Sequence, residues 1–457
     1  MRAFTSHMQA RRAGLALGLC AAFVWSPSFA EPLPEPLTLE YALAHLSDDH
    51  PRLALSRAAI EAAEAGVAQA ESGNDFDARL RLEAAWTEPN PEARDQSHDD
   101  SLATLHLSKP LYDFGRTDHA VGAASRLAEG RRLLHGDERR AQRMEIMQRY
   151  LDVVLADQEY GWAYEVMAIA FVTLDKARDR NELGQVSDID LSEREAAFQE
   201  SRAQWVAATQ RQRTARALLA ESLNRPGELP STVSRPRLVL DGRELPDVAV
   251  LLEQALHSNP RLAALQRDAE AAAERIAAAR AGRKPLLSAE ATAGTYRRDL
   301  GGRDAVRAGL VLEVPLYTGG RTDAAIAAAQ AEARQAQARA REYEYRLRQA
   351  VLEAWQEIQV LKVRREQAAA LGRYREMYAD RSRAYYELEL QTDFGDSMIE
   401  QSAAELFGLR TDYELVLAWE RLAQLTGHSG YSLFADAAPS TDQPSGRAAG
   451  ARPEGAQ

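Results

Sequence analysis

The amino-acid sequence predicts a mainly α-helical protein in which one unit occurs twice and each unit contributes a pair of β-strands. Three observations lead to this prediction. The segment LSKPLYDFGRTDHAVGAA at 107–124 returns as LEVPLYTGGRTDAAIAAA at 312–329, with 11 identities in 18 positions at a constant offset of 205. Stretches that alternate between polar and apolar residues precede each copy, and a helical pattern of some 65 residues follows each copy. Because internal repeats fix the architecture of a chain, we expect the two halves to share one fold.

Residues 1–30 have the pattern of a secretory signal peptide. Basic residues precede an apolar stretch of about a dozen residues that is too short to span a bilayer, and small residues follow it. The only cysteine, Cys20, lies in this segment, so we expect no disulfide and no thiolate metal site in the mature chain. Lipid attachment at Cys20 is disfavoured, because Leu19 stands where a small residue is required.

The charge and hydropathy of the chain exclude two classes of protein. The formal net charge is −12, and removal of residues 1–30, which carry three arginines and no acidic residue, makes it −15. A chain this acidic has no basic footprint for nucleic acid. No later stretch approaches 18 consecutive apolar residues, so no transmembrane helix is predicted.

The first unit is predicted to span residues 31–224. After a Pro-rich lead-in, segment 39–72 is rich in Ala, Leu, Glu and Arg and therefore favours a helix. Residues 77–86 and 101–107 alternate between polar and apolar side chains around a polar loop, a pattern that predicts a β-hairpin. A long helix follows at 118–183, and a second helix returns to the end of the unit.

The second unit, residues 247–434, repeats this order. A helix is predicted at 247–283, a hairpin from the alternating segments 287–294 and 307–314, and a long helix at 323–390. Each long helix would measure about 100 Å at 1.5 Å per residue. Both carry apolar residues at the 3-4-3 spacing of a coiled-coil seam. No small globular core can cover helices of this length.

Two further segments complete the predicted organisation. Residues 225–246 contain four prolines and are interpreted as the linker between the units. Residues 435–457 are rich in Ala, Pro, Ser and Gly and are predicted to be a disordered C-terminal tail.

The repeated motif PLYxxGRTD is interpreted as a strand-to-helix junction. Proline ends the strand because it cannot donate to the ladder, glycine permits the bend, and Thr117 or Asp118 can cap the helix that follows, as can Thr322 or Asp323. The motif is expected to shape the chain and to carry no chemistry. Its predicted junction residues are Pro110, Leu111, Tyr112, Gly115 and Arg116 in the first unit and Pro315, Leu316, Tyr317, Gly320 and Arg321 in the second.

Acidic residues gather where each long helix breaks, and these breaks are the best candidates for function. The segments are GQVSDIDL at 184–191 and LQTDFGDS at 390–397. One interpretation is that the acidic residues only cap the returning helices. The other is that a ring of such carboxylates in an oligomer favours cations, as acidic rings do in pores. The residues of this predicted ring are Asp188, Asp190, Asp393 and Asp396.

No pattern indicates an enzyme. The histidines lack metal-ligand spacing, the Gly-Gly pairs lack a following Lys-Ser/Thr, and no nucleophile lies beside a candidate base. We therefore expect neither catalysis nor a cofactor nor a metal.

The order helix, hairpin, PLYxxGR, long helix, turn and returning helix, found twice after a signal peptide, resembles the outer-membrane efflux protein family typified by TolC. The resemblance covers residues 38–430. It implies a homotrimer whose chains each give four strands to a shared twelve-stranded barrel in the outer membrane, while the helices form a long α-helical barrel through the periplasm. Lipid would then meet the apolar faces, and polar side chains would face water inside. The lipid-facing residues are Leu80, Leu82, Ala84 and Trp86 in the first unit and Leu287, Ala289, Ala291 and Ala293 in the second, and the water-facing residues are Arg79, Arg81 and Glu83.

The resemblance also implies that the helical tips form the periplasmic entrance and dock an adaptor, or membrane fusion, protein. Family tips carry Gly six residues before Asp. Gly184 and Asp190 keep this spacing, whereas Leu390 replaces the glycine before Asp396, which leaves docking at the second tip open. Thr392 stands where some members have arginine, so a different closing latch is expected. The implied docking residues are Gly184, Gln185, Val186 and Ser187 in the first tip and Leu390, Gln391 and Thr392 in the second.

The leading hypothesis is a passive trimeric exit duct in the outer membrane, extending into the periplasm. It would serve a tripartite efflux pump or a type I secretion system through an adaptor and an inner-membrane pump or ABC transporter. The alternative is a soluble periplasmic coiled-coil scaffold or adaptor, in which the alternating segments would not face lipid. Drugs, metal ions and secreted polypeptides all remain open as cargo.

Overall fold

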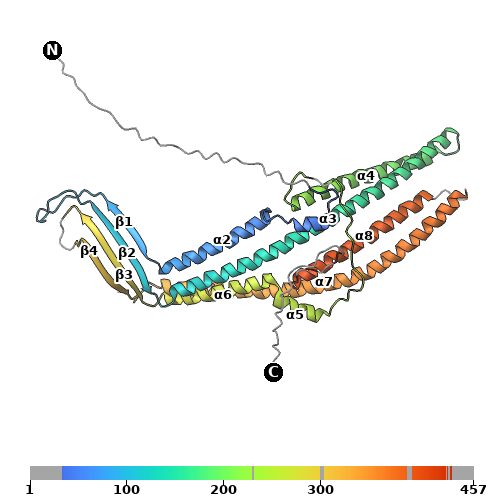
Figure 1. Ribbon diagram of the computed structural model, residues 1–457. Coiled ribbons are helices and arrows are strands. Elements are labelled where there is room, and N and C mark those ends of the chain that lie inside the picture. The colour runs from blue at the N-terminus through green and yellow to red at the C-terminus, as the bar shows by residue number, and fades with distance from the viewer. Residues whose placement is uncertain are drawn as a thin grey trace, which may run out of the picture.

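The computed structural model describes residues 33–228, 231–298, 303–388, 394–428, 430 and 433–434. The predicted signal peptide and the predicted C-terminal tail lie outside the described residues. The chain is elongated, with a β-sheet at one end and the tips of two helical hairpins at the other (Figure 1). Long helices connect the two ends.

The elements follow one order in both units. In the first unit they are α1 (Leu39–Ala44), α2 (Pro51–Glu71), the 3₁₀ turn η1 (Ser72–Asn74), β1 (Asp77–Glu83), β2 (Leu102–Tyr112), α3 (Arg116–Glu182) and α4 (Asp188–Ser222). In the second they are α5 (Val248–Ser258), α6 (Pro260–Ala281), β3 (Leu286–Tyr296), β4 (Val306–Glu313), α7 (Arg321–Glu387) and α8 (Phe394–Leu425). Helices α3 and α7 have 67 residues each, and their starts keep the sequence offset of 205. The duplication is therefore present in the fold.

The first predicted helix of each unit is divided in two, which the sequence analysis did not foresee. The breaks lie before Pro51 and Pro260, where the side chains of His50 and Asn259 accept hydrogen bonds from backbone N–H groups. Proline has no N–H to donate, and it disfavours the helical conformation in the residue before it. It therefore starts a new helix here, a position that it tolerates well.

The four strands form one antiparallel sheet in the order β1-β2-β3-β4, so the pair β2–β3 joins the two units. Leu80 lies opposite Leu105, Leu105 opposite Ala293, and Ala293 opposite Val306. Directly opposite residues share a face of a sheet. The two hairpins therefore present their apolar residues on the same side, as predicted.

The second strand of the first unit is longer than predicted. We expected Pro110 to end it, but β2 continues to Tyr112, with a register shift between these two residues. A bulge accommodates a residue that cannot donate to the ladder. In the second unit β4 ends at Glu313, before Pro315, as expected.

The helices keep the lateral order of the strands. Next to the sheet, α3 packs between α2 and α6, and α6 also packs against α7. Toward the tips, α3 packs between α4 and α8, and α8 also packs against α7. Helix α7 therefore lies at one lateral edge of the described chain, whereas α2 and then α4 lie at the other (Figure 1).

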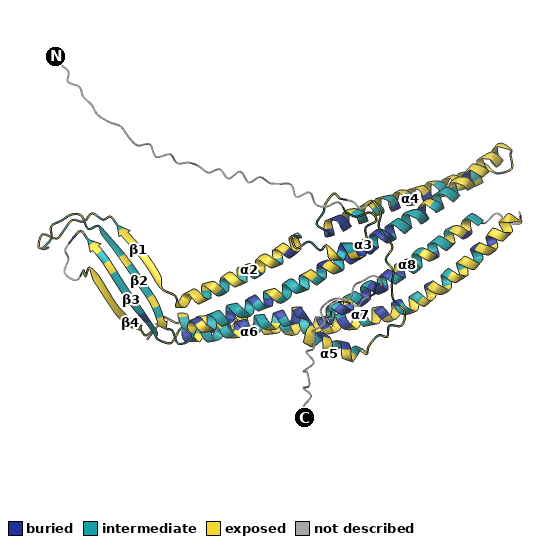
Figure 2. Cartoon of the chain, in the orientation of Figure 1, coloured by how far each residue is buried: buried dark blue, intermediate teal, exposed yellow. Residues whose placement is uncertain are grey.

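The apolar core is concentrated at the waist, midway along the long helices (Figure 2). The segment predicted as a linker is part of this core. Its residues 231–246, here called the belt, include the buried Leu240, and the carbonyl oxygen of Ser234 lies 2.6 Å from the hydroxyl oxygen of the buried Tyr150 of α3. The connection between the units is thus packed against the helices and is not a free linker.

The junctions keep the predicted glycines but use a different cap. Gly115 and Gly320 have φ values of 87° and 79°, in the left-handed region, immediately before α3 and α7. Neither Thr117 nor Asp118 caps α3. The carboxylate of Asp113 does so, by accepting hydrogen bonds from the N–H groups of residues 115, 116 and 117 at 3.0, 3.1 and 2.7 Å.

The electrostatics of this cap differ between the two units. Burial favours the protonated form of Asp113, but hydrogen bonds from Thr117 and from the two preceding N–H groups outweigh it and hold the pKa of Asp113 below its usual value. In the second unit Thr318 takes the equivalent position, and its hydroxyl oxygen lies 3.0 Å from that of Thr322.

We expect Asp113→Ala to lower the free energy of unfolding by about 1 kcal/mol at neutral pH, because three N–H groups lose their acceptor. Since folding lowers the pKa of Asp113, its contribution is present above the unfolded-state pKa and is lost as the pH falls through the folded-state pKa. The difference between variant and parent, followed by circular dichroism during heating, should therefore shrink in acid. Thr318→Ala is the matched control, and equal losses in both variants would contradict the role of Asp113.

Candidate functional site

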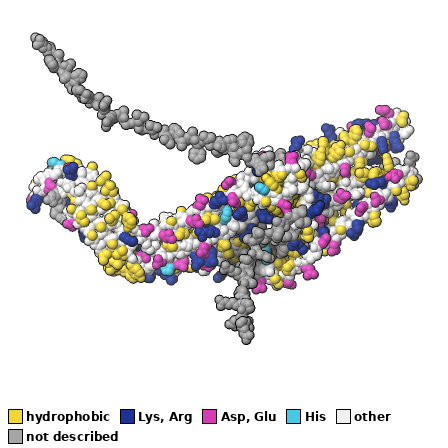
Figure 3. All heavy atoms as spheres, in the orientation of Figure 1, with side chains coloured by type: hydrophobic (Ala, Val, Ile, Leu, Met, Phe, Trp, Pro, Cys, Tyr) yellow, Lys and Arg dark blue, Asp and Glu magenta, His cyan; other side chains and the backbone are white. Residues whose placement is uncertain are grey.

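One face of the sheet is apolar and exposed over both hairpins. Leu80 and Leu82 in β1 are 67% and 71% exposed, and Leu310 and Leu312 in β4 are 71% and 61% exposed. Hydrophobic side chains cover much of the sheet in the space-filling view (Figure 3). Soluble monomers rarely leave so continuous an apolar patch in water. This face therefore suits contact with lipid.

The opposite face of the sheet is polar. Arg79, His106, Thr292 and Arg307 lie directly opposite one another in a row across all four strands. The Nδ1 atom of His106 lies 3.2 Å from the Oγ1 atom of Thr292. Arg79 and Arg81 lie on the face away from Leu80, as the alternation of the sequence requires.

Both outer edges of the sheet are unpaired within the described chain. Each of β1 and β4 has one neighbour among the described strands, on its inner side. Unpaired backbone N–H and C=O groups are a template for another strand. Inside a lipid bilayer they must find such a partner, because no water is available to them.

The first helical tip is a tight turn built by backbone hydrogen bonds. Gly184 has a φ of 69°. Its N–H and that of Gln185 donate to the carbonyl oxygens of Asn181 and Arg180 at 2.9 and 2.8 Å, the pattern of a Schellman motif. A Cβ atom added at Gly184 would meet nothing within 4 Å. The backbone conformation, and not a lack of space, favours glycine here.

The acidic residues of this tip, Asp188 and Asp190, lie in the first turn of α4, and the N-cap of this helix is Ser187. The Ser187 hydroxyl accepts a hydrogen bond from the N–H of Asp190 at 3.1 Å and donates one to its carboxylate at 2.8 Å. Asn181 donates to the carboxylate of Asp188 at 3.0 Å and to the carbonyl oxygen of Val186 at 2.9 Å. Both carboxylates are held by local bonds on residues that are exposed to solvent.

The two tips lie at the same end of the molecule (Figure 1). In the second, the predicted Leu390, Gln391, Thr392 and Asp393 lie outside the described residues. Asp396 is exposed in the first turn of α8. The structure thus brings Asp188 and Asp190 together on one hairpin and places Asp396 on the other.

The two hairpins also touch near the tips, at residues that sequence reasoning missed. A Cβ atom added at Gly395 of α8 would lie 3.2 Å from the Cδ1 atom of Ile169 of α3. The hydroxyl of Ser402 donates to the carboxylate of Glu165 at 2.7 Å. These partners lie in different units of the sequence, so no local pattern could have indicated them.

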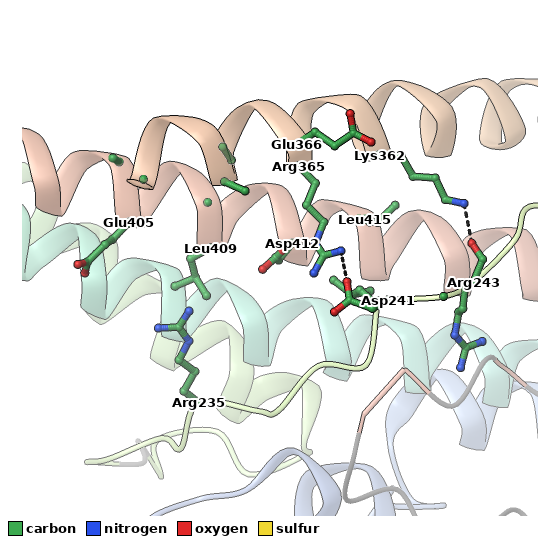
Figure 4. A pocket seen from close by; sticks show the side chains of 17 residues that line it. Arg235, Asp241, Arg243, Lys362, Arg365, Glu366, Glu405, Leu409, Asp412 and Leu415 are labelled. Atoms are coloured by element: carbon green, nitrogen blue, oxygen red, sulfur yellow. Dashed lines mark hydrogen bonds and ion pairs between the residues drawn. The ribbon is translucent and has the colours of Figure 1, made fainter. Parts of the chain in front are cut away.

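A pocket of about 900 Å³ lies at the waist between α7, α8 and the belt (Figure 4). Arg365 of α7 bridges Asp241 of the belt, at 2.7 Å, and Asp412 of α8, at 2.9 Å. Lys362 donates to the carbonyl oxygen of Arg243 at 2.7 Å. These ion pairs and this hydrogen bond, here called the clasp, hold the belt against α7 and α8 of the second unit.

Two classes of feature are absent from the described ranges. No group of three or more His, Cys, Asp or Glu side chains there is arranged to hold a metal ion. Among the helices of the same ranges, none combines the length and the apolar character needed to cross a membrane.

Comparison with known proteins gives consistent results. Residues 251–428 match the family model of the outer membrane efflux proteins. The chain is 24% identical over 263 residues to the outer membrane efflux protein BepC of Brucella suis, in a match that covers 56% of this chain and 56% of BepC. The chain therefore spans little more than half the length of this relative.

Solved structures share the fold over most of the chain. The outer membrane protein VceC of Vibrio cholerae superposes with a TM-score of 0.68 at 19% identity, covering 85% of this chain and 96% of VceC. The outer membrane channel CmeC of Campylobacter jejuni gives a TM-score of 0.72 at 14% identity, covering 92% and 94%. Together with the family match, these findings confirm the predicted fold class, the family resemblance and the location in the outer membrane with an extension into the periplasm.

The tip geometry yields a prediction about local stability. Ser187→Ala should cost about 1 kcal/mol locally, because the first turn of α4 loses its N-cap. Amide hydrogen exchange at residues 184–191 should become faster, while exchange at the waist stays unchanged. Gln185→Ala is the control, since this exposed side chain caps no helix. Equal exchange in the two variants would argue against the cap.

Proposed function

We propose that this chain, a member of the outer membrane efflux protein family, forms a homotrimeric channel through which cargo leaves the cell envelope. The observation that carries the proposal is the sheet, which combines an exposed apolar face, a polar face and two unpaired edges. Such a sheet satisfies its backbone in lipid only when other copies complete a closed barrel.

The number of strands favours three copies. A barrel of about eight strands has an interior just wide enough to be filled by side chains, and a larger barrel encloses a passage. Two copies of this chain would supply eight strands, whereas three would supply twelve. The polar row with Arg79 and Arg307 would then line the passage, and Leu80 and Leu310 would meet lipid.

The helices extend the same ring into the periplasm. Because they keep the lateral order of the strands, a ring that closes between β4 and the next β1 also brings α7 beside the next α2 and α4. At the tips, Leu183 and Ile189 are 71% and 81% exposed beside the carboxylates of Asp188 and Asp190. We propose that these apolar residues dock an adaptor protein and that the carboxylates, with Asp396, narrow the closed entrance.

The channel is proposed to be passive. Energy would come from an inner-membrane pump or an ABC transporter, reached through the adaptor, as in a tripartite efflux pump or a type I secretion system. The relatives are named as efflux proteins and channels, and no catalytic step is assigned to this chain. The wall of such a duct is unselective, so the pump would choose the cargo.

A soluble periplasmic scaffold is the second candidate, and the exposed apolar face disfavours it. In a scaffold, Leu80, Leu82, Leu310 and Leu312 would remain in water at 61% to 71% exposure. Each Å² of apolar surface left in water costs about 25 cal/mol of free energy. This exposure would therefore destabilise a protein that is surrounded by water.

Membrane fractionation and heat-modifiable migration test the trimer. We expect the protein in the outer-membrane fraction, and we expect it to run as a trimer on denaturing gels when unheated and as a monomer after boiling. Leu80→Asp with Leu310→Asp should reduce membrane recovery, because each charge must then face lipid. Recovery of the parent protein as a soluble monomer would favour the scaffold instead.

Single-channel recording tests the gate. We expect Asp190→Ala with Asp396→Ala to raise single-channel conductance in planar bilayers, because the substitutions remove two carboxylates per copy from the proposed entrance. Asp190→Glu with Asp396→Glu keeps the charges and serves as the control. Unchanged conductance in the alanine variant would remove both residues from the gate.

A further inference from the structure

Helix α7 carries a second apolar stripe on a side that its buried residues do not use. This α7 stripe consists of Leu352, Val363, Tyr374 and Tyr385, which are 40%, 65%, 51% and 40% exposed. Its members recur every three helical turns, so they form one line along the helix. Leu361, which is buried, precedes Val363 by two residues and thus points about 200° away around the helix.

We propose that the α7 stripe packs on helix α4 of a neighbouring copy of this chain. The inference rests on the proposed trimer and names the surfaces that join its helices. Helix α7 lies at one lateral edge and α4 at the other. A ring that closes through β4 and the next β1 therefore places these two helices together in the half nearer the tips.

The outward face of α4 has the shape that the α7 stripe requires. Ile189, Ala196 and Ala203 are exposed and stand seven residues apart, the spacing of a coiled-coil position. Ser201, two residues before Ala203, is buried and thus points about 200° away, on the packed side of α4. Alanines leave holes along this face, and the large side chains of the α7 stripe supply knobs.

The two surfaces also lie at the same height. The chain runs toward the tips in α7 and away from them in α4, and both tips lie at the same end (Figure 1). The stretch from Tyr374 to the last residue of α7 is two residues shorter than the stretch from the first residue of α4 to Ala203. Measured along the helices from these two ends, at a rise of about 1.5 Å per residue, the two positions differ by about 3 Å.

Charge complementarity supports the same pairing. Arg381 is exposed seven residues after Tyr374, on the side of the α7 stripe, and its guanidinium lies 4.6 Å from the ring of Tyr378. Glu193 is exposed on the outward face of α4. Neither side chain makes an ion pair within the described residues. Arg381 lies six residues before the end of α7 and Glu193 five residues after the start of α4, so opposite charges meet at one level.

Disulfide crosslinking tests the pairing, because Cys20 of the predicted signal peptide is the only native cysteine. The full chain with Tyr374→Cys and Ala203→Cys should be oxidised in outer membranes and run on boiled, non-reducing gels. We expect most of it to shift from the monomer band to dimer and trimer bands, with nothing larger, because the ring closes after three copies. Reduction should reverse the shift.

The matched control is Glu376→Cys with Ala203→Cys. Glu376 is exposed two residues beyond Tyr374, at nearly the same height but about 200° around α7. This pair should stay monomeric. Equal crosslinking of both pairs, or none in either while unheated gels still show the trimer, would overturn the proposed surfaces. Loss of the trimer from the parent protein would instead count against the proposed function.

A charge exchange gives a second test that needs no cysteine. Arg381→Glu should lower the temperature at which the trimer dissociates on gels, since the introduced carboxylate would face that of Glu193. Adding Glu193→Arg should restore that temperature to near the parent value. If the dissociation temperature of the double variant fell by the sum of the decreases in the two single variants, the pairing of these charges would be overturned.

Discussion

The unpaired outer edges of β1 and β4 are the constraint on which the rest of the structure depends. Backbone groups in lipid must be hydrogen-bonded, and the described part of one chain offers four strands, which cannot close on themselves. The apolar face makes lipid the suitable surroundings, so in the proposed channel other copies complete the barrel. Because the helices continue the lateral order of the strands, this proposed closure would also decide which helix faces become interfaces between copies.

The repeat and the alternation were sufficient to predict the fold class, because both are local and occur twice. The predictions that failed concern local features that the comparison of the two halves did not reveal. Pro51 and Pro260 start new helices within segments whose composition favours a single one. The cap of α3 comes from Asp113, which has no acidic counterpart in the second unit, so the comparison of the two halves pointed to Thr117 and Asp118 instead.

The candidate site was predictable only where it is local. The break at 184–191 was visible because Gly184, Ser187 and Asp190 are turn and cap residues at suitable spacing. The clasp of Arg365 with Asp241 and the contact of Gly395 with Ile169 join distant segments, so they required the fold. Helix α7 shows the limit most clearly. Leu361 and Val363 are equally apolar, and only the packing shows that the first is buried and the second exposed.

The order of the elements explains how a duplicated unit could build the proposed ring. Helix α3 of the first unit corresponds to α7 of the second, and α4 corresponds to α8. Within the chain α3 packs against α8, so the long helix of one unit contacts the returning helix of the other. The proposed contact of α7 with α4 of the next copy would repeat this arrangement between copies. In that contact the face of α4 with Ala196, Ala203 and Glu193 would meet the face of α7 with Tyr374 and Arg381. A contact between two such different faces runs head to tail, and it closes into a ring when its rotation allows.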